Sequence, residues 1–277
     1  MNPITSYESI VDVATPVILQ GDGNAQTDTN LLWTPPTGTR SAGTQFSEGM
    51  ALGYISLLNR SGGAAYVGIG VRIPNHYWSA GQWVDATTTY TDDTVDAQDT
   101  GSADFALETT TASDGFTIAS TVKFNAVLID IGTASVDAVS VARAARYSDS
   151  AGTAYAALTT ILHTAAAVNY STTTETVIAW DVPTDWGVSV SGLGTGIPIG
   201  QYIVNVRATD APGTTAGVAN SLSLYRIYFL ESIANNATKE INFSPSEARM
   251  LNGNGLAAFF SVANASNKVT ALVRLRS

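Results

Sequence analysis

The sequence predicts an all-β protein built from two β-sandwich or jelly-roll-like domains, with one or two short helices. The first observation is a series of short apolar runs bounded by turns rich in Gly, Pro and Asn. The second is the period of a strand within 201–209, where Tyr202, Val204, Val206 and Ala208 alternate with Ile203, Asn205 and Arg207. The third is composition, because 45% of the residues are hydrophobic and only 13% are charged, which supports a packed core.

The expected strands combine apolar or β-branched residues with flanking turn signals. In chain order they are 11–19, 30–33, 50–58, 64–73, 116–131, 175–182, 201–209, 218–230, 256–263 and 269–276. We expect 50–58 and 64–73 to form a hairpin across the turn 59–63, and 256–263 and 269–276 to form a second hairpin. The second half of 218–230 is apolar on both faces, which predicts burial between two layers.

Helix signals are few. The segment 154–168 places Tyr155, Leu158, Ile161 and Leu162 at helical spacing, which predicts a helix. A second short helix is expected from Ser244, because a Pro follows it directly and a Glu stands three residues later, and it should end before Gly253. The segment 134–146 is compatible with helix or strand.

The distribution of charge indicates the domain organisation. Between Arg72 and Lys123 there is no Lys or Arg, whereas eight acidic residues occur there. A second change in composition comes at the polar stretch 233–237. The segments near the two ends also resemble each other, since both contain an Asn-x-Ser turn between strands. We therefore expect a discontinuous domain of residues 1–80 and 232–277, with residues 81–231 inserted as a second domain.

Several classes of function are disfavoured by composition. The chain has no Cys, which excludes disulfides, thiolate zinc sites and a cysteine nucleophile. A net charge of −10 disfavours a nucleic-acid partner. The first residues lack the pattern of a signal peptide, and no apolar run is long enough to span a membrane. We expect a soluble protein that is made in a cytoplasm and has neither a membrane nor a nucleic-acid partner.

The acidic stretch 92–99 is a weak candidate for calcium, through Asp92, Asp93, Asp96 and Asp99. Carboxylate oxygens suit this cation, but the stretch lacks the central Gly and the closing Glu of an EF-hand loop. The alternative is a solvated loop that like charges hold open.

Catalytic patterns are sparse, and we expect no catalytic residue, no cofactor and no enzyme activity. His76 and His163 are far apart in the sequence, and their ordinary interpretations are a packed and a surface histidine. The segment 187–191 lacks the second Gly of a nucleophile elbow. The Gly-rich segment 192–200 lacks the Lys of a phosphate loop and contains Pro198, so we interpret it as a turn between strands.

Aromatic residues offer an alternative function. Trp78, Trp83 and Trp186 lie near polar residues that suit sugar hydroxyls, namely Gln82, Asp85, Asp181 and Asp185. Exposed rings at these positions would bind glycan. Burial in the core or in a subunit interface is the ordinary role of Trp.

Three features carry a resemblance to a known group of proteins. They are the segment WTPPTGTR at 33–40, the strand–Asn-x-Ser–strand pattern at 59–61 and at 264–266, and the segment WVDATTTYTDDT at 83–94, continued by DFAL at 104–107. Together they resemble the β-sandwich virion proteins of tailed bacteriophages, where such segments are common in capsid decoration and tail-tip proteins. The resemblance implies a structural role and supplies no catalytic residue.

The expected function is therefore that of a capsid decoration (cement) protein on the outer surface of a bacteriophage head. The partners would be the major capsid protein or other virion proteins, and the protein would form a homotrimer. The segments 11–19 and 256–276 would anchor it, with Arg274 and Arg276 as candidate interface residues or as ordinary charges on an edge strand. Two alternatives stay open: a tail or head-fibre module that binds host glycan, and a depolymerising enzyme with Asp181 and Asp185 as its carboxylates.

Overall fold

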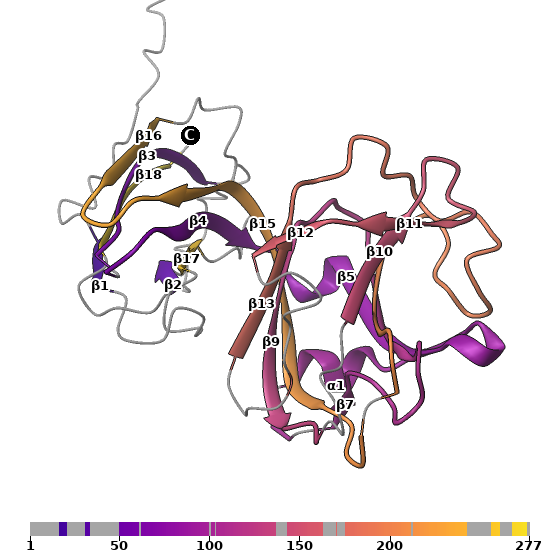
Figure 1. Cartoon of the computed structure of the whole chain (residues 1–277). Helices are drawn as coiled ribbons and strands as arrows, with labels where there is room; N and C mark the ends of the chain where they lie inside the picture. Colours follow the sequence, from indigo (N-terminus) through magenta and orange to yellow (C-terminus); the bar gives the residue numbers. More distant parts are fainter. Residues whose placement is uncertain are drawn as a thin grey trace, which may run out of the picture. The chain divides into compact units, whose positions relative to one another are not determined.

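The computed structural model confirms that the chain is all-β, with antiparallel sheets and very little helix (Figure 1). It describes residues 17–20, 31–33, 50–60, 62–99, 101–102, 104–136, 143–162, 170, 175–211, 213–242, 256–260 and 268–275. The chain divides into two compact units. Unit 1 consists of Met1–Arg72 and Ile227–Ser277, and unit 2 consists of Ile73–Arg226. The expected domain boundaries, after residues 80 and 231, lie inside the strands β5 (Trp78–Val84) and β15 (Val218–Ile233).

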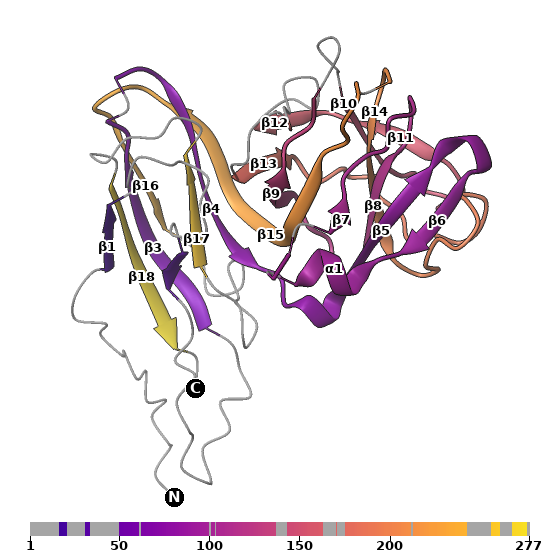
Figure 2. The ribbon, with the colours of Figure 1, turned by 90° about the horizontal axis from the view of Figure 1, so that it is seen from below.

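Unit 1 contains two sheets of strands, seen as two layers in Figure 2. The first has the order β1-β18-β3-β16, with β1 at Val17–Gln20, β18 at Lys268–Leu275, β3 at Met50–Leu58 and β16 at Thr238–Asn242. The second contains the end of β15 followed by β4 (Ala65–Arg72), β17 (Leu256–Phe260) and β2 (Leu31–Trp33). Because β1 pairs with β18, segments from near both ends of the chain lie in one sheet.

Neither of the two expected hairpins forms. β3 pairs with β16 and β18, whereas β4 belongs to the other sheet and pairs with β17. β17 and β18 are likewise in different sheets. The two strands of each expected hairpin therefore belong to different sheets, because the apolar face of each sheet must be covered by the other sheet rather than by the next strand in sequence.

Unit 2 is built from one six-stranded sheet and part of an eight-stranded sheet. The six-stranded sheet has the order β11-β10-β14-β8-β5-β6, with β11 at Tyr155–Leu158, β10 at Arg143–Ser148, β14 at Tyr202–Ala208, β8 at Gly115–Ser120 and β6 at Thr89–Asp92. The other contains β12 (Thr160–Leu162), β13 (Glu175–Trp180), β9 (Ala126–Thr133) and the first part of β15, with which β7 (Phe105–Ala106) also pairs. In the described part of unit 2, the short helical segments are α1 (Thr94–Gln98) and the 3-10 turns Asn75–Tyr77 and Asp85–Thr87.

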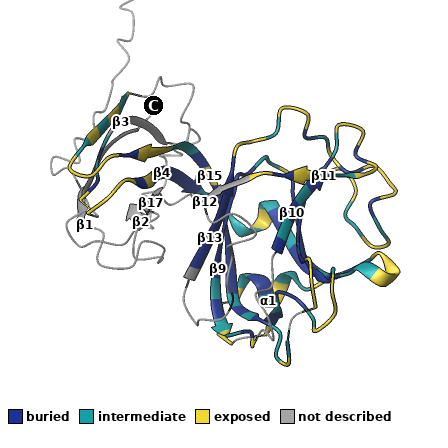
Figure 3. Ribbon diagram, viewed as in Figure 1, coloured by how far each residue is buried: buried dark blue, intermediate teal, exposed yellow. Residues whose placement is uncertain are grey.

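The main core of unit 2 contains alternate residues from both of its sheets. Phe116, Ile118 and Val204 of the six-stranded sheet share one cluster with Ile129 and Leu222 of the other. Figure 3 shows the high proportion of buried residues in β9 and β13. The opposite face of the six-stranded sheet is therefore an outer face, and its side chains are free to form other contacts.

Several local predictions differ from the structure. The segment 154–162 forms β11 and β12 instead of a helix, because β11 completes the edge of the six-stranded sheet beside β10. The expected strand 116–131 is divided into β8 and β9, which lie in different sheets. In the undecided segment, β9 ends at Thr133 and β10 begins at Arg143. The helix expected after Ser244 lies outside the described residues.

Candidate functional site

A row of polar side chains crosses the outer face of the six-stranded sheet. Arg146 of β10 lies opposite Asn205 of β14, which lies opposite Thr117 of β8. Arg146 Nε donates a hydrogen bond to Asn205 Oδ1 (2.7 Å), and Asn205 Nδ2 donates to Thr117 Oγ1 (2.9 Å). Arg207, two residues after Asn205, lies on the same face. The alternation of β14 therefore positions both Asn205 and Arg207 beside Arg146.

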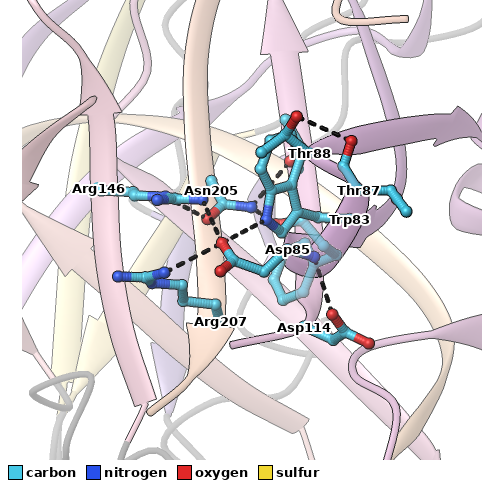
Figure 4. Close-up of polar contacts among 10 residues, drawn as sticks. Trp83, Asp85, Thr87, Thr88, Asp114, Arg146, Asn205 and Arg207 are labelled. Atoms are coloured by element: carbon cyan, nitrogen blue, oxygen red, sulfur yellow. Dashed lines mark hydrogen bonds and ion pairs between the residues drawn. The ribbon is translucent and has the colours of Figure 1, made fainter. Parts of the chain in front are cut away.

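The carboxylate of Asp85 contacts both arginines of this face (Figure 4). Its Oδ1 accepts hydrogen bonds from Arg207 Nη1 (3.2 Å) and from Trp83 Nε1 (3.3 Å). Arg146 Nη2 forms an ion pair with the same oxygen at 3.5 Å. Asp85 is held in place by its own main-chain N–H, which donates to Asp114 Oδ1 (2.9 Å). We call Asp85, Arg146, Asn205 and Arg207 the Asp85 cluster.

Arg146 is the most constrained member of the Asp85 cluster. Its guanidinium carbon lies 4.1 Å from the ring centroid of Tyr155 and 5.2 Å from that of Trp83, which are cation–π distances. Burial, and then the nearby charge of Arg207, lowers the pKa of Arg146. The guanidinium stays charged at neutral pH. A single carboxylate oxygen thus faces two arginines.

The Gly-rich segment covers another part of the same outer face. Leu193 packs against Ala119 and Ile203, and Ile197 packs beside them. Thr195 bridges to the edge strand β6. Gly194, with φ of +151°, lies so close to Trp83 that a Cβ atom would come within 2.7 Å of the indole ring. Gly194 and Gly196 therefore lie too close to the sheet for a side chain, whereas Gly200 has open space around it.

The three tryptophans considered as a sugar platform lie in the interior. Trp78, Trp83 and Trp186 expose 4%, 1% and 3% of their surfaces. Trp78 and Trp186 belong to the core between the sheets of unit 2, and Trp83 lies beneath the Gly-rich segment. None of them presents a ring face to a sugar, because the ring faces contact other side chains.

The other residues considered from sequence are scattered. Asp181 is exposed, and Asp185 accepts a hydrogen bond from the Tyr147 hydroxyl (2.8 Å). His76 is exposed rather than packed in the core, with its ring 4.2 Å from that of Tyr77, and His163 lies outside the described residues. Arg274 belongs to β18, at a position opposite Ala51, and Arg276 also lies outside the described residues.

Of the four aspartates considered for calcium, Asp92 and Asp99 make separate local contacts, whereas Asp93 and Asp96 interact with each other. Asp92 Oδ1 accepts from the main-chain N–H of Thr94 (3.2 Å), and Asp99 Oδ1 accepts from that of Gly101 (2.6 Å). Asp93 and Asp96 lie at the start of α1, so a short helix occupies the stretch that we interpreted as an open loop. Within the described ranges, there is no group of three or more His, Asp or Glu side chains that could hold a metal ion.

Asp93→Asn is expected to change the dependence of stability on pH. Burial, followed by a hydrogen bond with Asp96 and the charges of neighbouring aspartates, raises the pKa of Asp93 from 3.8 to about 6. The stabilising contribution of this group is therefore complete below pH 3.8 and is lost as the pH rises through about 6. Because the side chain is partly exposed, we expect the variant to gain only about 1 kcal/mol over the wild type at pH 7.5 and nothing at pH 4.

Urea denaturation at both pH values measures this effect. Asp181→Asn is the matched control, because it removes the same charge from an exposed position. It should leave the difference in free energy of unfolding between pH 4 and pH 7.5 the same as in the wild type. An equal gain for Asp93→Asn at pH 4 and at pH 7.5 would contradict the raised pKa.

A second surface of interest is apolar. Val188 and Val190 are exposed and flank the buried Ser189. The main-chain N–H of Gly200, the residue after Ile199, donates to the carbonyl of Ser189 (2.7 Å), the residue between the two valines. Val190 is 52% exposed and Ile199 is 73% exposed. We call Val188, Val190 and Ile199 the Val190 patch.

The Asp85 cluster was only partly foreseeable. Asp85 was considered only as one of four polar neighbours of the tryptophans, and both arginines were missed. The alternation in 201–209 already placed Asn205 and Arg207 on one face, and this is the signal that could have found them. Within the described residues, no helix has the length and the apolar character needed to cross a lipid bilayer. Comparisons of the chain with models of protein families, with curated proteins and with solved structures find no match.

Proposed function

We propose that this chain is a structural protein of a bacteriophage particle, where it decorates the outer surface of the head and stabilises the shell through protein–protein contacts. The observation that carries the proposal is the Val190 patch. The large apolar side chains of this patch are exposed at the surface, beside main-chain hydrogen bonds. Covering them with another protein is favourable by about 25 cal/mol for each Å² of apolar surface that is buried. The sequence motifs that resemble those of phage virion proteins suggest which assembly this is.

In this proposal the Val190 patch lies in a contact between subunits of a homotrimer. Viral β-sandwich proteins commonly assemble around a symmetry axis. Unit 1, which holds the paired strands β1 and β18, contacts the major capsid protein. The net charge of −10 favours the exterior of the head, because an acidic protein is repelled by packaged DNA.

The double variant Val190→Asp/Ile199→Asp is expected to be monomeric while the wild type is trimeric. Burying two new carboxylates in an apolar contact is unfavourable, whereas the isolated subunit keeps both positions in water. The free energy of unfolding of the subunit should therefore change by less than about 1 kcal/mol. Multi-angle light scattering measures the oligomeric state, and the same samples are added to shells that lack the protein to measure shell stability.

Val136→Asp is the matched control, because Val136 is also more than half exposed but is not part of the Val190 patch. It should leave both the trimer and the stabilisation of the shell intact. Mass spectrometry of purified particles then tests where in the particle the protein lies. The copy number of a decoration protein should scale with the number of capsid subunits in the shell. A monomeric wild type that no shell binds would overturn the proposal, and a few copies in each particle would assign the chain to the tail.

A further inference from the structure

The Asp85 cluster has more donors than its own acceptors can use. Arg146 Nη2 is buried and makes no hydrogen bond, since its ion pair with Asp85 Oδ1 is 3.5 Å long. Within the described part of the chain, Arg207 contacts this same oxygen through Nη1. Its side chain is 31% exposed, and the guanidinium carries further N–H donors.

The cluster also has an acceptor without a donor. All the contacts of the Asp85 carboxylate reach Oδ1, and Oδ2 accepts no hydrogen bond from the residues that the structure describes. The side chain is 35% exposed. Guanidinium donors and a carboxylate acceptor are thus offered together, within one small area of the sheet face (Figure 4).

We propose that the Asp85 cluster binds a sugar that carries a carboxylate, such as a uronic or sialic acid. The carboxylate of the sugar accepts hydrogen bonds from Arg207 and balances the second positive charge, in the way that arginine commonly binds carboxylates. A hydroxyl of the sugar donates to Asp85 Oδ2. This assignment goes beyond the proposed role in assembly and does not depend on it.

Other ligands fit these groups less well. A neutral sugar supplies hydroxyls but leaves the pair of arginines with one carboxylate between them. An acidic side chain of another protein supplies only acceptors, so it leaves Asp85 Oδ2 without a donor. A carboxylated sugar satisfies both requirements in one small molecule.

The site is also organised in advance. Arg146 is fixed by its hydrogen bond to Asn205 and by the ring of Tyr155, and Asp85 is fixed by Asp114 through its main chain. A ligand therefore does not have to immobilise these side chains on binding, which removes an entropic cost.

The experiment is a titration of the full chain with each probe at constant ionic strength. Binding is monitored through the amide chemical shifts in NMR spectra. The probes are D-glucuronate, N-acetylneuraminate, D-glucose and acetate. We expect saturable binding of at least one of the two sugar acids, weaker binding of acetate and no saturable binding of glucose. The shifted amides should belong to β10, β14 and the turn that holds Asp85.

Arg207→Gln is expected to weaken binding of the sugar acid at least about tenfold, because it removes a charged hydrogen-bond donor. Arg207→Lys keeps the charge but loses the fork of donors, and it should weaken binding by a smaller factor. Arg226→Gln is the matched control, since it removes an exposed arginine of the same unit from a different sheet and should leave the affinity unchanged. Circular dichroism verifies that each variant is folded.

Three outcomes would overturn the proposal. One is binding of glucose as tight as that of the sugar acids. Another is unchanged affinity in folded Arg207→Gln. The third is equal affinity for acetate and for the sugar acids, which would point to an acidic protein segment as the ligand. None of these outcomes bears on the Val190 patch, so failure here and failure of the assembly role are distinguishable.

Discussion

Glu108→Gln is expected to lower the free energy of unfolding of unit 2 by about 3–5 kcal/mol, because it leaves a buried arginine without its counter-charge. Glu108 and Arg143 are both buried. Arg143 Nη2 lies 2.8 Å from Glu108 Oε1, and Arg143 Nε donates to Oε2 at 2.9 Å, so the pair is bidentate. The guanidinium also lies 4.1 Å above the buried ring of Tyr170. A neutral glutamine cannot compensate the charge that remains.

The measurement is urea denaturation of the full chain, with tryptophan fluorescence as the signal of unfolding. Four of the five tryptophans belong to unit 2, so the signal reports mainly on that unit. Glu231→Gln is the matched control, because Glu231 pairs with Lys239 at 2.6 Å on the surface. It should cost less than about 1 kcal/mol.

A double variant separates the charge from the packing. Glu108→Leu/Arg143→Met removes both charges and keeps most of the buried volume, so we expect it to recover at least half of the loss seen in Glu108→Gln. If Glu108→Gln lowers the free energy of unfolding no more than Glu231→Gln does, then the ion pair of Glu108 and Arg143 is not buried in the way that the structure describes.

The strands of this protein could be predicted to the extent that they depend on local sequence. β3 has the expected bounds, and β14 differs from the expected segment by one residue at each end. Alternation and flanking turns are local properties, so a single sequence contains them. The partner of each strand is not local. The Asn-x-Ser turn after β3 resembles that of a hairpin, yet β4 pairs in the other sheet.

The incorrect helix has a similar cause. The apolar residues of 154–162 fit helical spacing, but β10 offers an unpaired edge, and Tyr155 lies opposite Ser148 in the resulting ladder. The sheet overrides the local preference. The Asp85 cluster could not be predicted as a whole, because it joins residues 85, 146 and 207, whose proximity depends on the order of the strands.

Trp186→Ala is expected to destabilise unit 2 by about 3–5 kcal/mol, because it creates a cavity in the core. The indole ring lies 5.3 Å from Phe124 and 5.5 Å from Tyr202 between ring centroids, in tilted and edge-to-face arrangements. Its Nε1 donates to Ser148 Oγ (3.1 Å), which in turn donates to the carbonyl of Gly187 (2.6 Å). The substitution therefore removes both packing and a buried hydrogen bond.

This substitution also distinguishes a core residue from a sugar platform. A core role predicts a loss of stability with unchanged binding of the sugar acids, provided that binding is measured where the variant is still folded. Trp186→Phe is the graded control, because it keeps most of the ring contacts and loses the hydrogen bond, and we expect it to cost about 1–3 kcal/mol. Unchanged stability in Trp186→Ala together with lost sugar binding would place the ring at the surface, contrary to its packing against Phe124 and Tyr202.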